Sequence, residues 1–162
     1  MIKPLMQKVL IVVSSADSSI HAAKYGILLS KLYHSTLKAV YVVDTATLRQ
    51  LTLNKFFVAD ESREYEESLE RDGERYLEYV QELGEQKGVK IETQLLRGSV
   101  WSEVVKAANV MGADLILLGG IENRGDDRRD VLSTAYREIL TNANCSVLMV
   151  REEMIDQMFR LA

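Results

Sequence analysis

Short apolar runs alternate with longer segments of helical periodicity along the whole chain, and this alternation constrains the fold more than any other feature. The runs, rich in β-branched and aliphatic residues, are Lys8–Val13, 37–43, 89–96, 114–118 and Ser146–Val150. Parallel strands need crossovers long enough for helices, and these crossovers are right-handed. The pattern therefore predicts an α/β fold with a single doubly wound, five-stranded parallel sheet in the order 3-2-1-4-5 and helices on both faces.

The connecting segments show where the helices lie. Helices are predicted at about residues 18–33 and 61–87, from Ser99 as N-cap to near Gly112, and at 130–142. Gly88 has the position of a glycine that ends a helix. The run 89–96 alternates between apolar and polar residues at its start, which is typical of an edge strand.

Residues 44–60 have no clear period and contain Phe56 and Phe57 among polar residues. We interpret this segment as a crossover loop with a short helix whose aromatic side chains pack on the core. A lid over a ligand is the alternative, because long loops are where lids occur.

Length and composition limit the class of protein. The chain has 162 residues, 47% hydrophobic and 27% charged, enough for one domain with a continuous core. Its net charge of −4 gives no reason to expect nucleic acid as a partner. No apolar run approaches the roughly 20 residues of a membrane span, and no cleavage site follows the first run, so we expect a cytoplasmic location. The one cysteine, Cys145, excludes an intrachain disulfide, and we interpret it as a core residue.

The chain divides into a domain of residues 1–150 and a tail of residues 151–162. The tail has an apolar stripe that we predict to be helical: Met154, Ile155, Met158, Phe159 and Leu161. Such a stripe either docks on the core of its own chain or makes a partner contact, and the sequence leaves both open.

The segment 115–134 combines a buried apolar run, a break at Gly119 and Gly120, a charged stretch and the start of a helix. A strand, a glycine-rich turn and a helix in this order bring backbone N–H groups up to a phosphate. With the strand order 3-2-1-4-5, the order of the strands reverses between the first and fourth strands. Residues 14–17 and 119–129 would then face one crevice, where doubly wound sheets bind ligands.

Within that segment the spacing is Gly120, two residues, Asn123, nine residues, then Ser133 and Thr134. It resembles the loop of the nucleotide-binding branch of the universal stress protein family, which reads Gly, two residues, Gly, nine residues, Gly, then Ser or Thr. Gly98, residues 112–116 and residues 144–150 also match that family. The resemblance covers the whole chain except the tail, and it implies the family's fold and a crevice for ATP.

The departures from the family pattern fall at the ligand. Asn123 and Ser133 replace glycines; asparagine tolerates a left-handed backbone, whereas Ser133 adds a side chain where the helix would face phosphate. In ATP-binding members an aspartate follows the first strand, and Ser14 stands there instead. Loss of a charge-assisted hydrogen bond costs about 1.5–3 kcal/mol. Asp17, three residues later, is predicted to be an N-cap.

The resemblance implies a set of cofactor-binding positions, with the backbone of Val42 near the adenine: Ser14, Val42, Gly120, Asn123, Arg124, Ser133 and Thr134. Arg124, with Arg128 and Arg129, would suit a phosphate. We interpret these arginines instead as surface charge offset by Asp126, Asp127 and Asp130.

Two hypotheses about function follow from the resemblance. The first is a dimeric regulatory or stress-response protein with weak or absent ATP binding. The alternative is an ATP- or AMP-binding module, or a slow ATPase of the same family, with ATP and Mg²⁺ as the candidate cofactors.

An enzyme of another class finds no support in the sequence. Neither His21 nor His34 has a partner at metal-ligand spacing, and no nucleophile elbow or Walker loop occurs. We therefore predict no catalytic residue and no metal site.

A homodimer is expected through the short apolar edge Ser146–Val150, because an unprotected strand edge invites pairing. The family that the chain resembles often pairs through this strand. The sequence does not identify a further protein partner.

Overall fold

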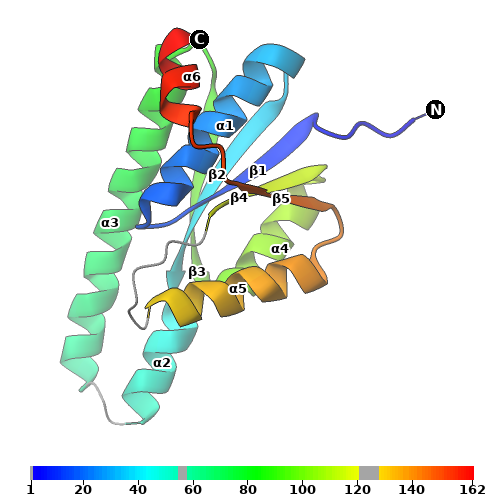
Figure 1. The fold of residues 1–162 in the computed structure, drawn as a ribbon. Helices are drawn as coiled ribbons and strands as arrows, with labels where there is room; N and C mark the ends of the chain where they lie inside the picture. The colour runs from blue at the N-terminus through cyan, green and yellow to red at the C-terminus, as the bar shows by residue number, and fades with distance from the viewer. Residues whose placement is uncertain (1, 55–57, 121–127) are drawn as a thin grey trace.

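The computed structural model describes residues 2–54, 58–120 and 128–162, with the backbone alone for residues 128–133. Strands and helices alternate as expected (Figure 1). In chain order the elements are β1 (Lys8–Val13), α1 (Asp17–Tyr33), β2 (Thr36–Asp44), α2 (Thr45–Leu53), α3 (Ala59–Gln86), β3 (Ile91–Gly98), α4 (Val100–Met111), β4 (Leu115–Gly119), α5 (Arg128–Asn142), β5 (Ser146–Val150) and α6 (Ile155–Leu161).

The strands form one five-stranded sheet in the order β3-β2-β1-β4-β5, with every pairing parallel, which confirms the predicted topology. β1 lies at the centre, where Val9 is in register with Leu37 of β2 and Leu115 of β4. β3 and β5 are the edges, so the alternation in the third run did indicate an edge strand.

Helices cover both faces of the sheet. α1, α3 and α6 lie on one face, and α4 and α5 on the other (Figure 1). Because successive strand residues point to opposite faces, Val9 and Ile11 of β1 join the first core, and Leu10 and Val12 join the second. Burial on both sides explains why the run is apolar without interruption.

The segment after β2 forms the expected short helix, α2. Asp44 caps it, since the Thr47 N–H donates to the Asp44 carboxylate. The Thr52 and Ser62 hydroxyls, 3.0 Å apart, connect α2 to α3, which extends beyond the sheet beside it (Figure 1). Phe56 and Phe57, which we expected to pack on the core, lie outside the described residues.

The structure differs from the prediction at the start of α1 and at the start of β3. The N-cap of α1 is Ala16, and Asp17 is the first helical residue, where its charge favours the helix dipole. β3 begins at Ile91 and not at Val89, because the Val89 N–H donates to the Gly84 carbonyl and closes the end of α3. Gly88 has a φ of +69°, as a helix-ending glycine requires. Ser99 is the N-cap of α4 but makes no side-chain capping bond.

The C-terminal segment forms α6, which packs against α1. Ile155 and Phe159 are buried, whereas Met158 is exposed. Lys24 of α1 donates to Asp156 at 2.6 Å, and its ammonium also lies 5.5 Å from the centre of the Phe159 ring. The apolar stripe of the tail is therefore split between the core and solvent.

Among the described helices, none is long and apolar enough to cross a membrane.

Gly119 ends β4 against the first turn of α1, and its position leaves no space for a side chain. A Cβ there would meet the carbonyl group of Ser18 and lie 2.7 Å from the Ser19 nitrogen. These are backbone atoms, so the helix itself would have to move.

We expect Gly119→Ala to lower the free energy of unfolding by about 1–3 kcal/mol or more, the usual cost of overpacking a core. Gly120→Ala is the matched control, because the nearest atom to its Cβ, the Val150 carbonyl oxygen, is 3.4 Å away. Urea unfolding of both variants measures the difference. Equal midpoints would contradict the packing described here.

Candidate functional site

Two adjoining cavities lie at the carboxyl ends of the strands, the inner one at the ends of β1 and β2 and the outer one at the end of β2, among α2, α4 and α5. The outer one has a volume of about 450 Å³ and the inner one about 160 Å³. Asp44 and Val100 line both cavities, so the two adjoin at these residues. The outer volume is in the range of small-molecule sites.

The inner cavity is mainly apolar and aromatic. Its described lining comes from the ends of β1 and β2 and from α3, α4 and α5: Val12, Val13, Ser14, Ser15, Tyr41, Val42, Val43, Asp44, Leu69, Val100 and Tyr136. Tyr41 stacks on Tyr76, with ring centres 6.2 Å apart and planes within 5°. Burial, together with the nearby Asp72 carboxylate, raises the pKa of Tyr41 to about 12. The cavity has the character that a planar, weakly polar group requires.

Serine hydroxyls fix the loop after β1. The Ser14 N–H donates to Ser19 Oγ at 3.0 Å, and the Ala16 N–H donates to Ser14 Oγ at 3.2 Å. Ser19 is fully buried, and its hydroxyl lies 2.9 Å from the carbonyl oxygens of both Ser14 and Ala16. Ser14 therefore belongs to a fixed turn, at the wall of the inner cavity.

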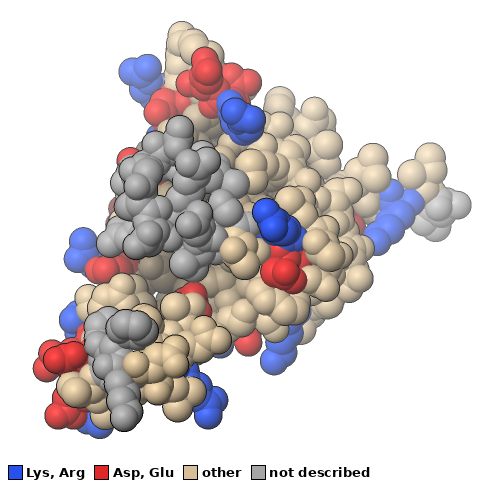
Figure 2. Space-filling view, turned by 60° about the horizontal axis from the view of Figure 1, so that its bottom comes forward, with Lys and Arg blue, Asp and Glu red and all other residues tan. Residues whose placement is uncertain are grey.

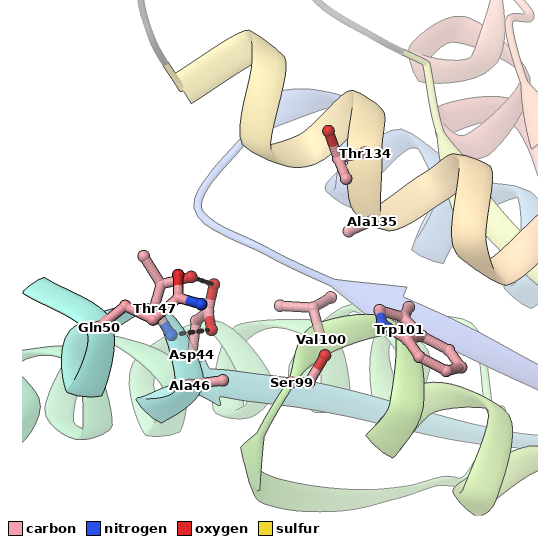
Figure 3. A pocket seen from close by; sticks show the side chains of 9 residues that line it. All are labelled: Asp44, Ala46, Thr47, Gln50, Ser99, Val100, Trp101, Thr134 and Ala135. Atoms are coloured by element: carbon pink, nitrogen blue, oxygen red, sulfur yellow. Dashed lines mark hydrogen bonds between the residues drawn. The ribbon is translucent and has the colours of Figure 1, made fainter.

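The outer cavity has one polar wall and an apolar floor (Figure 3). On the wall, the Thr47 N–H donates to Asp44 Oδ1 at 3.0 Å and the Thr47 hydroxyl donates to Asp44 Oδ2 at 2.7 Å. Gln50 of α2 lines the same cavity (Figure 3). Val100 and Trp101 of α4 form the floor, and Thr134 of α5 lies across the cavity (Figure 3).

The structure brings together some of the residues that the sequence singled out. Ser14 and Val42 line the inner cavity, and Thr134 lines the outer one. Gly120 is not among the described residues that line either cavity; its backbone lies beside Val150.

The other predicted positions lie between residues 121 and 133. Asn123 and Arg124 lie outside the described residues, as do Asp126 and Asp127. Ser133, Arg128, Arg129 and Asp130 are placed on α5 by their backbone alone.

Sequence reasoning missed Asp44, Gln50 and Trp101. Asp44 could have been found, because it is the last residue of the second strand and the carboxyl ends of parallel strands meet at one edge. Gln50 could not, because its place depends on how α2 packs across that edge.

Charge and metal-binding groups are sparse around the crevice. Over the described part of the face in Figure 2, acidic and basic side chains are interspersed and form no broad basic patch. In the part of the chain that the structure describes, no group of three or more His, Cys, Asp or Glu side chains could hold a metal ion.

A doubly wound parallel α/β sheet with cavities at the carboxyl ends of its strands is typical of a class of ligand-binding proteins. Comparison with known proteins identifies the family. The family model of the universal stress protein family matches residues 6–151. Universal stress protein MJ0531 of Methanocaldococcus jannaschii is 34% identical over 149 residues, covering 91% of this chain and 84% of that protein. The chain therefore belongs to the universal stress protein family.

Solved structures share the fold. A universal stress protein family member from Burkholderia pseudomallei has a TM-score of 0.70 at 21% identity, covering 93% of this chain and 99% of that chain. The universal stress protein from Archaeoglobus fulgidus in complex with dAMP has a TM-score of 0.60 at 15% identity, covering 90% of this chain and 98% of that one.

The raised pKa of Tyr41 predicts a change of stability in alkaline solution. Between about pH 10, where an unfolded tyrosine titrates, and about pH 12, the folded state keeps the Tyr41 proton that the unfolded state has lost. The contribution of neutral Tyr41 to folding is therefore complete below pH 10 and is lost as the pH rises toward 12.

We expect the wild type to lose more stability than Tyr41→Phe between pH 9 and 11, by up to about 1.4 kcal/mol per pH unit, the linkage of one proton. Urea unfolding across this range measures both slopes. Parallel curves for the two proteins would contradict the assignment.

Proposed function

We propose that this chain is a regulatory stress-response protein that binds adenine nucleotides weakly in the two adjoining cavities and catalyses no reaction. The observation that carries the proposal is the meeting of Ser14, Val42 and Thr134 around these cavities. The inner cavity suits a base, and the outer cavity, with Asp44 and Gln50, suits a polar sugar. A relative of the same fold has been solved with dAMP, which supports this assignment.

Weak binding follows from the residues that replace the family's ligand contacts. Ser14 stands where a carboxylate would accept a strong hydrogen bond, and its Oγ already accepts one from Ala16. Asn123 and Ser133 replace glycines at positions that face phosphate in the nucleotide-binding branch. Each change weakens the contact with nucleotide without removing the crevice.

The absence of catalysis is inferred from the chemistry of the lining. Around both cavities, Asp44 is the one carboxylate among the described residues, and these include no histidine, cysteine or lysine. General acid–base catalysis needs positioned groups that exchange a proton with the substrate. The alternative, a stronger ATP-binding module or slow ATPase with Mg²⁺, is distinguished by the experiment below.

Thermal unfolding with and without ATP and Mg²⁺ tests the proposal, since a ligand that binds only the folded state raises the midpoint. We expect a small rise for the wild type and a larger one for the triple variant Ser14→Asp, Asn123→Gly, Ser133→Gly. A rise in the wild type as large as in the variant, accompanied by phosphate release, would favour the ATPase. No rise in either protein would reject nucleotide binding at this crevice.

The assembly that we propose is a cytoplasmic homodimer paired through β5, with residues 1–150 as its domain and residues 151–162 as an appended segment. β5 is an edge of the sheet, and the side chains of Val147, Leu148 and Met149 are only partly buried within one chain. Such an edge is open to pairing with a second copy.

Light scattering coupled to size exclusion should give a molar mass near twice the 18.3 kDa of one chain. The expected mass holds as the protein is diluted to micromolar concentration, because a continuous apolar edge pairs stably. A mass of one chain at every concentration would contradict the dimer.

A further inference from the structure

We propose that Asp44 recognises the sugar hydroxyls of the bound ligand, so that the crevice selects ribonucleosides and their monophosphates by the sugar rather than by a phosphate chain. This inference rests on the proposed function, because it assigns a role within the same crevice.

Asp44 lines both cavities and carries a negative charge. Among the described lining residues it is the one carboxylate in the inner cavity and the one carboxylate in the outer cavity. A ligand with its base in the inner cavity and its sugar in the outer one must pass Asp44.

The alternation of side chains along β2 places Asp44 on the face of the sheet covered by α4 and α5. Val40 and Val42 of β2 point to the side covered by α4 and α5, and Asp44 has the same parity, so it points to that side too. Val100, Trp101 and Thr134 lie there as well, which agrees with the lining of the outer cavity.

The carboxylate is fixed before a ligand arrives. The Thr47 N–H donates to one of its oxygens and the Thr47 hydroxyl to the other, at 3.0 and 2.7 Å. Each carboxylate oxygen has a second lone pair, so both can accept one more hydrogen bond. Two neighbouring hydroxyls of a ribose can donate to the two oxygens of one carboxylate, a geometry that strengthens and orients binding.

Asp44 also supplies a negative charge near the end of β1, where Ser14 has none. In the register of β1 and β2, Val13 pairs with Tyr41, so Ser14 lies beside Val42 and Asp44 lies two residues further out. This separation is roughly 6–7 Å along the strand. The negative charge missing at Ser14 is therefore present on the neighbouring strand, closer to α2.

Capping of α2 alone would also explain why an aspartate occurs here, and Asp44→Asn separates the two roles. Asparagine caps a helix as well as aspartate does, but it has no charge and retains only one acceptor oxygen. We expect the variant to melt close to the wild type and to bind AMP about tenfold to a hundredfold more weakly, the loss of a charge-assisted hydrogen bond.

Calorimetric titrations with AMP and with 2′,3′-dideoxy-AMP make the test specific. The wild type should prefer AMP by at least about tenfold, while the Asp44→Asn variant should bind both ligands equally. Asp17→Asn is the control, because it removes the same charge from an exposed residue at the same edge that lines neither cavity, and its affinities should equal those of the wild type.

The possible outcomes separate failure of nucleotide binding from failure of sugar recognition by Asp44. If the wild type binds neither ligand, the proposed function fails. If it binds AMP and the dideoxy analogue equally, or if Asp44→Asn weakens both alike or tightens AMP, nucleotide binding stands but recognition of the sugar by Asp44 is overturned. The comparison of the two ligands on the wild type does not depend on how the variant folds.

Discussion

The contact between the end of β4 and the first turn of α1 determines the geometry of the crevice. The backbone of Gly119 lies against Ser18 and Ser19 so closely that only glycine fits there. Ser19, buried beneath this contact, binds the backbone of Ser14 and Ala16 through its hydroxyl. One contact thus fixes the start of α1 against the end of β4 and the course of the loop after β1.

The crevice that results has a mainly apolar inner part and an outer part with one polar wall. Its inner part is formed by aliphatic and aromatic side chains, with Tyr41 held by stacking on Tyr76. Its outer part has a fixed carboxylate at Asp44 and an amide at Gln50. The sequence departs from the nucleotide-binding branch of the family at Ser14, Asn123 and Ser133, where the resemblance implies contacts with the ribose or base and with the phosphates. We propose that loss of those contacts and retention of the cavities make a protein that senses a nucleotide and does not consume it.

Much of the fold could be predicted from the sequence, because periodicity reflects burial. The uninterrupted apolar run of β1 and the partial alternation of β3 distinguish a central strand from an edge strand, and the structure confirms both. Details that depend on competition for single hydrogen bonds were not predictable. Val89 has the residue type of a strand, but its N–H closes α3, so β3 begins at Ile91.

The site was less predictable than the fold, since its lining combines elements distant in sequence. Ser14 and Thr134 follow from the switch-point rule and the family spacing. Gln50 and Trp101 face the same cavity only because α2 and the start of α4 pack across the ends of the strands. Asp44 has the residue type of a helix cap, and its place in the lining of both cavities depends on how α2 and α4 pack at the ends of the strands.

Trp101 can report directly whether a nucleotide occupies this crevice. It is the one tryptophan of the chain, and it forms part of the floor of the outer cavity. Titration with AMP to millimolar concentration should change its fluorescence along a saturable curve. Its midpoint should match the dissociation constant obtained by calorimetry. A fluorescence that stays constant while calorimetry records binding would place the nucleotide elsewhere and contradict this account.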